Sequence, residues 1–125
     1  MAPDRDEPFG LKRSTIDKIT GVFAAVPEVE EVILYGSRAK GNYRPGSDID
    51  LTIKGKDLTL TLLLKIEGML DDLLLPYKID LSLFDSLDDP DLMDHIRRVG
   101  VVIYAKAGMP GRLPVNGNLP GAPAT

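Results

Sequence analysis

Residues 34–51 read LYGSRAKGNYRPGSDIDL, and this stretch decides the fold prediction. Its first residues close a short β-prone run that stops at Gly36 and Ser37, where the chain turns into a helical segment. Apolar and polar residues then alternate over 49–53, which is typical of a strand with one polar face. The pattern predicts two strands joined by a turn-rich loop at residues 41–47.

Two carboxylates, Asp48 and Asp50, are separated by a single residue at the second predicted strand. Because successive side chains of a strand alternate between its faces, both carboxylates point out of the same face. Like charges at this spacing repel each other unless a cation lies between them, and Mg²⁺ is the natural candidate. A solvated strand face with incidental acidic residues is the alternative reading of this pair taken alone.

A third carboxylate, Asp80, lies on a later predicted strand that spans residues 78–83. If this strand pairs beside the second one, three carboxylates surround a single metal position. Mg²⁺ prefers a few carboxylates together with waters and phosphates, so a nucleoside triphosphate would complete such a site. The chain has no cysteine and a single histidine, which excludes thiolate and imidazole-rich metal sites.

The turn after the first strand has the composition of an anion site. Gly36 allows a phosphate to approach the backbone, Ser37 adds a hydroxyl donor, and Arg38 and Lys40 supply positive charge. A plain strand-ending turn is the alternative reading of a glycine and serine by themselves. Tyr43 in the following loop either stacks on a nucleotide base or is a surface aromatic residue.

The rest of the chain predicts three helices and two more strands. The first helix, 15–25, has Ser14 as its N-cap, the second runs from an Asp57 cap to about residue 75, and the third follows Asp89 and Pro90 and ends at Gly100. The last two strands are residues 78–83 and 101–104. We therefore expect an α/β (α+β) fold with a small mixed sheet of about four strands flanked by helices.

Composition limits the class of protein. Of 125 residues, 43% are apolar and 27% charged, as in ordinary globular proteins, and the net charge of −4 argues against binding nucleic acid through phosphates. No apolar run approaches the ~20 residues that cross a membrane, and the N-terminus does not resemble a signal peptide. We expect a cytoplasmic protein that contacts neither nucleic acid nor membrane.

Three regions are expected along the chain. Residues 1–10 are a flexible N-terminus, residues 11–106 are the folded domain, and residues 107–125 are a disordered tail rich in proline and glycine. The second predicted helix, 58–75, has more leucine than one buried face requires. We therefore expect it to form a protein interface, either in a homodimer or in a hetero-oligomer. His95 lies within a predicted helix and is assigned no role.

The spacing of these motifs resembles a known signature. Gly36 and Ser37, ten residues, and then Asp48 and Asp50, with Asp80 on a later strand, are similar to the DNA polymerase β-like nucleotidyltransferase superfamily. Within it, the stretch 34–51 looks like the minimal nucleotidyltransferases, the MNT proteins, and the resemblance covers about residues 11–105.

This resemblance implies the fold, the site and the reaction. Gly36 and Ser37 would hold the triphosphate of ATP, Asp48 and Asp50 would ligate two Mg²⁺ ions, and Asp80 would complete the site and help activate the acceptor. The implied enzyme, a protein adenylyltransferase, transfers AMP to a hydroxyl, namely a tyrosine of a HEPN-domain toxin for which the chain is the antitoxin. The alternatives are transfer to a small molecule such as an aminoglycoside, and a non-catalytic module that neutralises a partner by contact.

Overall fold

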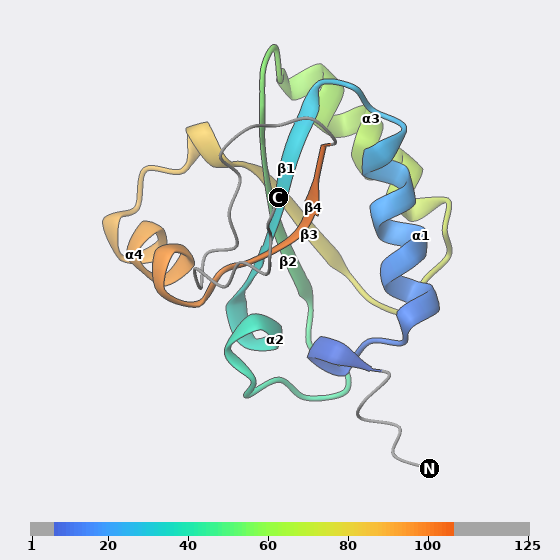
Figure 1. The fold of residues 1–125 in the computed structure, drawn as a ribbon, viewed down its shortest axis with the longest axis vertical. Coiled ribbons are helices and arrows are strands. Elements are labelled where there is room, and N and C mark those ends of the chain that lie inside the picture. Colours follow the sequence, from blue (N-terminus) through green and yellow to red (C-terminus); the bar gives the residue numbers. More distant parts are fainter. Residues whose placement is uncertain (1–6, 107–125) are drawn as a thin grey trace, which may run out of the picture.

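A mixed four-stranded sheet with helices on both faces forms the centre of the computed structural model, which describes residues 7–106 (Figure 1). The predicted tail, 107–125, and the first six residues lie outside the described part. In chain order, the elements are η2 (Pro8–Gly10), α1 (Arg13–Ala24), β1 (Val29–Tyr35), α2 (Gly36–Lys40), β2 (Ile49–Gly55), α3 (Leu60–Asp71), β3 (Ile79–Leu83), η3 (Phe84–Ser86), α4 (Pro90–Val99) and β4 (Val101–Ala105).

The strand order in the sheet is β3-β2-β1-β4. The central strand β1 pairs antiparallel with both β2 and β4, and β2 pairs parallel with β3. A parallel pair requires a crossover connection, which α3 supplies between β2 and β3. The small mixed sheet that the sequence predicts is therefore confirmed.

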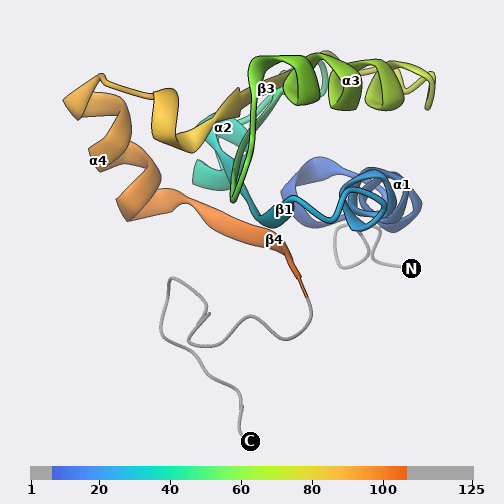
Figure 2. The same ribbon diagram turned by 90° about the horizontal axis from the view of Figure 1, so that it is seen from above.

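Two hydrophobic cores form on the two faces of this sheet. On one face, alternate residues of β1 and β2, such as Leu34 and Leu51, pack with Phe23 of α1 and Ile66 of α3. On the other face, Ile33 and Tyr35 pack with Ile96 of α4. Figure 2 shows α1 and α3 on one side of the sheet and α4 on the other. Only one face is covered by two helices, so part of the opposite face is left for polar residues.

Helix boundaries differ from the prediction at two N-termini. Helix α1 begins at Arg13 after Lys12, so Ser14 lies inside the helix and caps nothing. Helix α3 begins at Leu60, because the Thr59 hydroxyl accepts a hydrogen bond from the Leu62 amide at 3.1 Å. The expected cap, Asp57, instead adopts a positive φ of 59° in the preceding turn. Both predicted caps were therefore wrong: the neighbouring Thr59 caps α3, and no side chain caps the start of α1.

Two other segments differ from expectation. Strand β1 begins at Val29, three residues before the predicted run, and includes the buried Glu31, which pairs with Lys54 of the neighbouring strand β2 at 3.7 Å. A glutamate interrupts the apolar pattern that marks a strand. Residues 8–10, expected to be flexible, form the short η2 helix.

The leucine-rich segment is divided between core and surface. Ile66 and Leu70 of α3 are buried, whereas Leu60 and Leu64, one turn apart, are 66% and 58% exposed, and Leu74 after the helix is 87% exposed. The exposed leucines agree with the predicted surplus, and the interface stays a prediction. No helix within residues 7–106 is long and apolar enough to cross a membrane.

The correction at α3 gives a direct test. Thr59→Ala should lower the free energy of unfolding by about 1 kcal/mol, because it removes the side-chain acceptor that caps the helix. Ser14→Ala, the matched control, should change it by less than about 0.5 kcal/mol. Urea denaturation followed by circular dichroism measures both. A larger loss for Ser14→Ala than for Thr59→Ala would contradict the assignment.

Candidate functional site

The pairing of β2 with β3 brings two acidic residues together. Asp50 lies opposite Asp80 in the parallel register, and Tyr35 of β1 lies opposite Asp50 on the other side. Directly paired residues project from the same face of a sheet, so these three side chains share the face that α4 partly covers. Asp48 is exposed just before β2 and two residues from Asp50. The structure thus places all three predicted carboxylates at one end of one face.

Electrostatics link the three carboxylates. Burial raises the pKa of Asp50 above its ordinary value, and the negative charges of Asp80 and Asp48 raise it further. Burial also raises the pKa of Tyr35, with smaller contributions from Asp50 and Asp80, while a hydrogen bond with Ser82 acts in the opposite direction. The like charges therefore lie close enough to repel each other, which is the condition in which a divalent cation binds well.

The donor chemistry of this cluster suits Mg²⁺, whose preferred ligands are hard carboxylate oxygens, waters and phosphates. Within residues 7–106, however, no three acidic or histidine side chains already have the geometry of a metal site. That three carboxylates surround one metal position stays a prediction. Asp50 and Asp80, with Asp48 beside them, are the residues that could hold the ion.

The turn between β1 and α2 lies directly against Asp50. Gly36 begins α2 with a φ of +78°, in the left-handed region that favours glycine. A Cβ atom at this position would collide with the Asp50 carboxylate. Glycine is therefore required twice, by the backbone conformation and by the lack of space. Ser37 follows it in the first turn of α2 and is half-buried.

The amide of Gly36 already has a partner that the sequence did not indicate. It donates a hydrogen bond to Nε2 of His95, on α4, at 3.0 Å. The ring of His95 also meets the ring of Tyr35 edge-on, with centroids 6.3 Å apart. The expectation that the Gly36 amide faces outward to a phosphate is therefore corrected. No local sequence signal could have found this contact, because the two residues lie 59 positions apart in the chain.

The Arg38 side chain is not arranged for phosphate binding. It is only 2% exposed, and its guanidinium donates to the carbonyl oxygens of Phe9, Pro45 and Ser47 at 2.8–3.1 Å. It also lies over the rings of Tyr43 and Tyr77, at 5.3 and 5.0 Å from their centroids. Arg38 therefore holds the loop between α2 and β2, contrary to its predicted phosphate contact.

Lys40 and Tyr43 lie nearer the surface. Lys40 is exposed at the last turn of α2, so its charge is accessible to a ligand. The Tyr43 ring packs against the Arg38 guanidinium, which favours the reading of Tyr43 as a surface aromatic residue over a base-stacking role.

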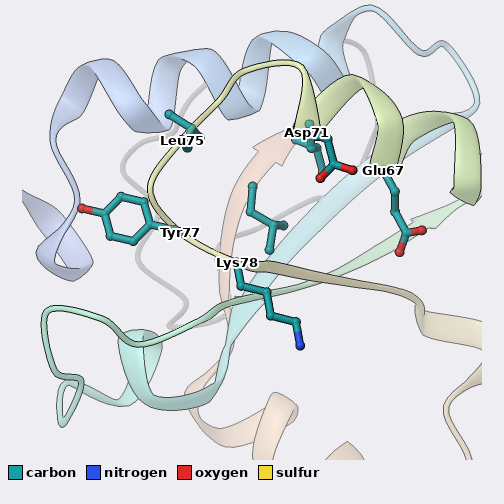
Figure 3. Close-up of a pocket in the computed structure, with 7 residues that line it drawn as sticks. Glu67, Asp71, Leu75, Tyr77 and Lys78 are labelled. Carbon is teal, nitrogen blue, oxygen red and sulfur yellow. The ribbon is translucent and has the colours of Figure 1, made fainter.

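A hollow of about 330 Å³ lies at the outer edge of the sheet, away from this cluster. Figure 3 shows Glu67 and Asp71 of α3 and Lys78 before β3 around it. Its wall includes Ile79, which projects from the face opposite to that of its neighbour Asp80. The hollow and the carboxylates therefore open on different faces of the sheet.

The buried hydrogen bonds of Arg38 predict that replacing it, even with lysine, lowers the stability of the fold. Arg38→Lys should lower the free energy of unfolding by about 2 kcal/mol, because an ammonium cannot reproduce the guanidinium fork that three carbonyls accept from. The exposed Arg44 of the same loop provides a matched control, and Arg44→Lys should stay within about 0.5 kcal/mol. Denaturant unfolding measures both. Equal stabilities of the two variants would show that Arg38 does not hold the loop.

The repulsion at Asp50 predicts a gain of stability on neutralisation. A pKa that is raised on folding means that the ionised carboxylate weakens the fold at neutral pH. In EDTA, Asp50→Asn should therefore raise Tm by roughly 2–4 °C, the value for about half a kcal/mol in a domain of this size. Asp17→Asn, on the exposed face of α1, should leave Tm unchanged. Calorimetry decides the point, and a lower Tm for Asp50→Asn would contradict the account.

Comparisons with known proteins bear on the family and the fold of the chain. A family model described as "Polymerase beta, Nucleotidyltransferase" matches residues 17–108. A comparison with curated proteins gave no significant match. Among solved structures, the chain is similar to a chain of a toxin-antitoxin complex with AMP-PNP, at 21% identity over 74% of each chain and a TM-score of 0.60.

Two other solved structures share the fold. One is a tri-AMPylated Shewanella oneidensis HEPN toxin in complex with MNT antitoxin, at 19% identity, with 75% of this chain and 72% of that chain covered and a TM-score of 0.56. The other is the toxin-antitoxin MntA-HepT, at 18% identity, with coverages of 76% and 74% and a TM-score of 0.56. Since the family model spans most of the chain and the sheet carries its acidic residues in register, the chain belongs to the polymerase beta nucleotidyltransferase family.

Proposed function

We propose that the protein transfers AMP from ATP to a hydroxyl group of a partner protein, a tyrosine of a HEPN-type toxin. The observation that carries the proposal is the in-register pairing of Asp50 with Asp80, with the Gly36 backbone packed against Asp50. Membership of a nucleotidyltransferase family supports the reaction class. The fold shared with chains of complexes that contain AMP-PNP or an AMPylated HEPN toxin supports the choice of nucleotide and partner.

Each site residue has a role in this proposal. Asp48 and Asp50 hold two Mg²⁺ ions, and Asp80 completes their ligand set. Bound Mg²⁺ supplies charge neutralisation for the triphosphate and lowers the pKa of the acceptor hydroxyl. Ser37 in the turn after β1 donates its hydroxyl to the triphosphate, and the exposed Lys40 adds positive charge at the end of α2.

The reaction is a displacement at the α-phosphorus of ATP. The acceptor oxygen forms a bond to this phosphorus, the bond from it to the oxygen that bridges the α- and β-phosphates breaks, and pyrophosphate leaves. The proton of the acceptor hydroxyl passes to Asp80 or to a water molecule. The turn that begins at Gly36 keeps the triphosphate in line, so that attacking and leaving oxygens lie on opposite sides of the phosphorus.

The partner surface in this proposal is the outer side of α3. Leu60 and Leu64 lie one helical turn apart and are largely exposed, and Leu74, just past the end of the helix, is exposed as well. Exposed apolar side chains that neighbour one another are typical of surfaces that bind another protein. A HEPN-type chain or a second copy of this chain is the proposed occupant.

Removal of two carboxylates tests the proposal directly. We expect Asp48→Ala with Asp50→Ala to reduce AMP transfer roughly 10³-fold, the effect of losing several kcal/mol of metal-assisted stabilisation. The assay uses ATP labelled at the α-phosphate, Mg²⁺ and host lysate, and follows labelled protein bands. Asp85→Ala with Asp88→Ala removes the same charge from exposed positions and should leave transfer intact.

The outcomes separate the alternative functions. A band that requires Mg²⁺ and disappears in the Asp48 and Asp50 double variant supports AMP transfer to protein. Pyrophosphate release that depends on an added aminoglycoside, without any protein band, would favour a small-molecule acceptor. If the double variant protects cells from the partner as well as wild type does, protection arises from contact alone and the catalytic account of it is wrong.

A further inference from the structure

We propose that His95 is a positioning residue of the nucleotide site, which fixes the turn at Gly36 and Ser37 against Asp50 and so controls triphosphate binding. The inference rests on the proposed function and deepens it, because it assigns a role at that site to a residue on a different helix. Its basis is the hydrogen bond from the Gly36 amide to Nε2 of His95, at 3.0 Å, between residues 59 positions apart.

The first amide of α2 needs a partner from outside its own helix. The first four N–H groups of any α-helix have no acceptor within it, and a side chain at the N-cap normally satisfies one of them. Tyr35 occupies the N-cap of α2 and makes no such hydrogen bond. His95 supplies the acceptor instead, so the position of this turn depends on α4.

The imidazole is itself held in place. Ile96, the next residue, is buried against Ile33 and Tyr35 and anchors α4 to the sheet. The His95 ring also contacts the Tyr35 ring edge-on, at an interplanar angle of 77°. Acceptance at Nε2 requires a neutral ring that carries its proton on Nδ1. Because the ring is packed in place and accepts at one defined atom, His95 can fix the position of the Gly36 amide.

The turn at Gly36 is therefore held in place by contacts on two sides. On one side the Gly36 backbone packs so closely on Asp50 that a Cβ atom has no space. On the other side the Gly36 amide is bound to His95. Loss of the second contact frees the turn to move relative to Asp50, and displacements of about 1 Å are enough to weaken a site that must hold reacting groups in line. Because its Nε2 lone pair is engaged, His95 is not placed to act as the catalytic base.

Nucleotide binding by the isolated protein provides the test. We expect His95→Ala to raise the Kd for AMP-PNP in the presence of Mg²⁺ about 3- to 10-fold, the effect of losing one hydrogen bond. The KM for ATP should rise by a similar factor, with a smaller change in kcat. His95→Gln carries a side-chain oxygen that can accept from the Gly36 amide, and it should recover most of the affinity. His95→Lys offers donors only and should not.

Leu92→Ala distinguishes positioning from general support of the fold. Leu92 packs in the same core under α4 but does not contribute the acceptor, so its truncation should lower Tm at least as much as His95→Ala while leaving the nucleotide Kd near the wild-type value. If Leu92→Ala weakens nucleotide binding as much as His95→Ala, or if His95→Ala binds as wild type does, the inference is overturned.

Amide hydrogen exchange distinguishes a failure of the positioning role of His95 from a failure of the proposed AMP transfer. The Gly36 amide should exchange faster in His95→Ala than in wild type, while amides within β1 should not change. Unchanged exchange at Gly36 would overturn the positioning role whatever the protein binds. A wild-type protein that binds no AMP-PNP with Mg²⁺, yet shows the expected exchange difference at Gly36, would instead overturn the proposed function and leave His95 as a cap of α2 only.

Discussion

The parallel pairing of β2 with β3 holds two like charges side by side, and the site depends on this unfavourable contact. Asp50 and Asp80 cannot separate without loss of the register that pairs them. A slip of one residue would turn Leu51, buried on the opposite face, toward solvent and bury carboxylates in its place. The apolar face of the sheet therefore fixes the acidic face, and the hydrophobic effect stabilises an arrangement that electrostatics opposes.

The parts of this site that follow from local pattern were predictable from the sequence. The alternation of apolar and polar residues around Asp50 and Asp80 predicts both that each lies on a strand and which face of the sheet it occupies. This works because the two-residue period of a strand is a property of its backbone. The glycine after Tyr35 marks the turn, and its necessity becomes clear only with Asp50 in contact. Asp89 followed by Pro90 correctly marked the start of α4, since both are signals contained within a few residues.

The parts that depend on distant segments were not predictable. Arg38 has the composition expected of a phosphate-binding turn, and only the approach of Phe9 and Tyr77 from elsewhere in the chain shows that it is a buried support for a loop. His95 is 59 residues from Gly36, and nothing in the pattern of α4 marks its ring as an acceptor for that amide. Buried Glu31 likewise hides the true start of β1 from any rule based on apolar runs.

The burial of Arg38 also changes the charge balance of the proposed site. Its positive charge is directed at three neutral carbonyls, so it offsets little of the negative charge of a triphosphate. The same triphosphate would face the carboxylates of Asp50 and Asp80, with Lys40 as the exposed cation at the end of α2. On the proposed function, divalent cations must therefore accompany the nucleotide, because without them the phosphates and carboxylates repel each other. A site that receives its metal together with the nucleotide has no need of a complete protein ligand set beforehand, because the phosphates supply the remaining oxygen ligands.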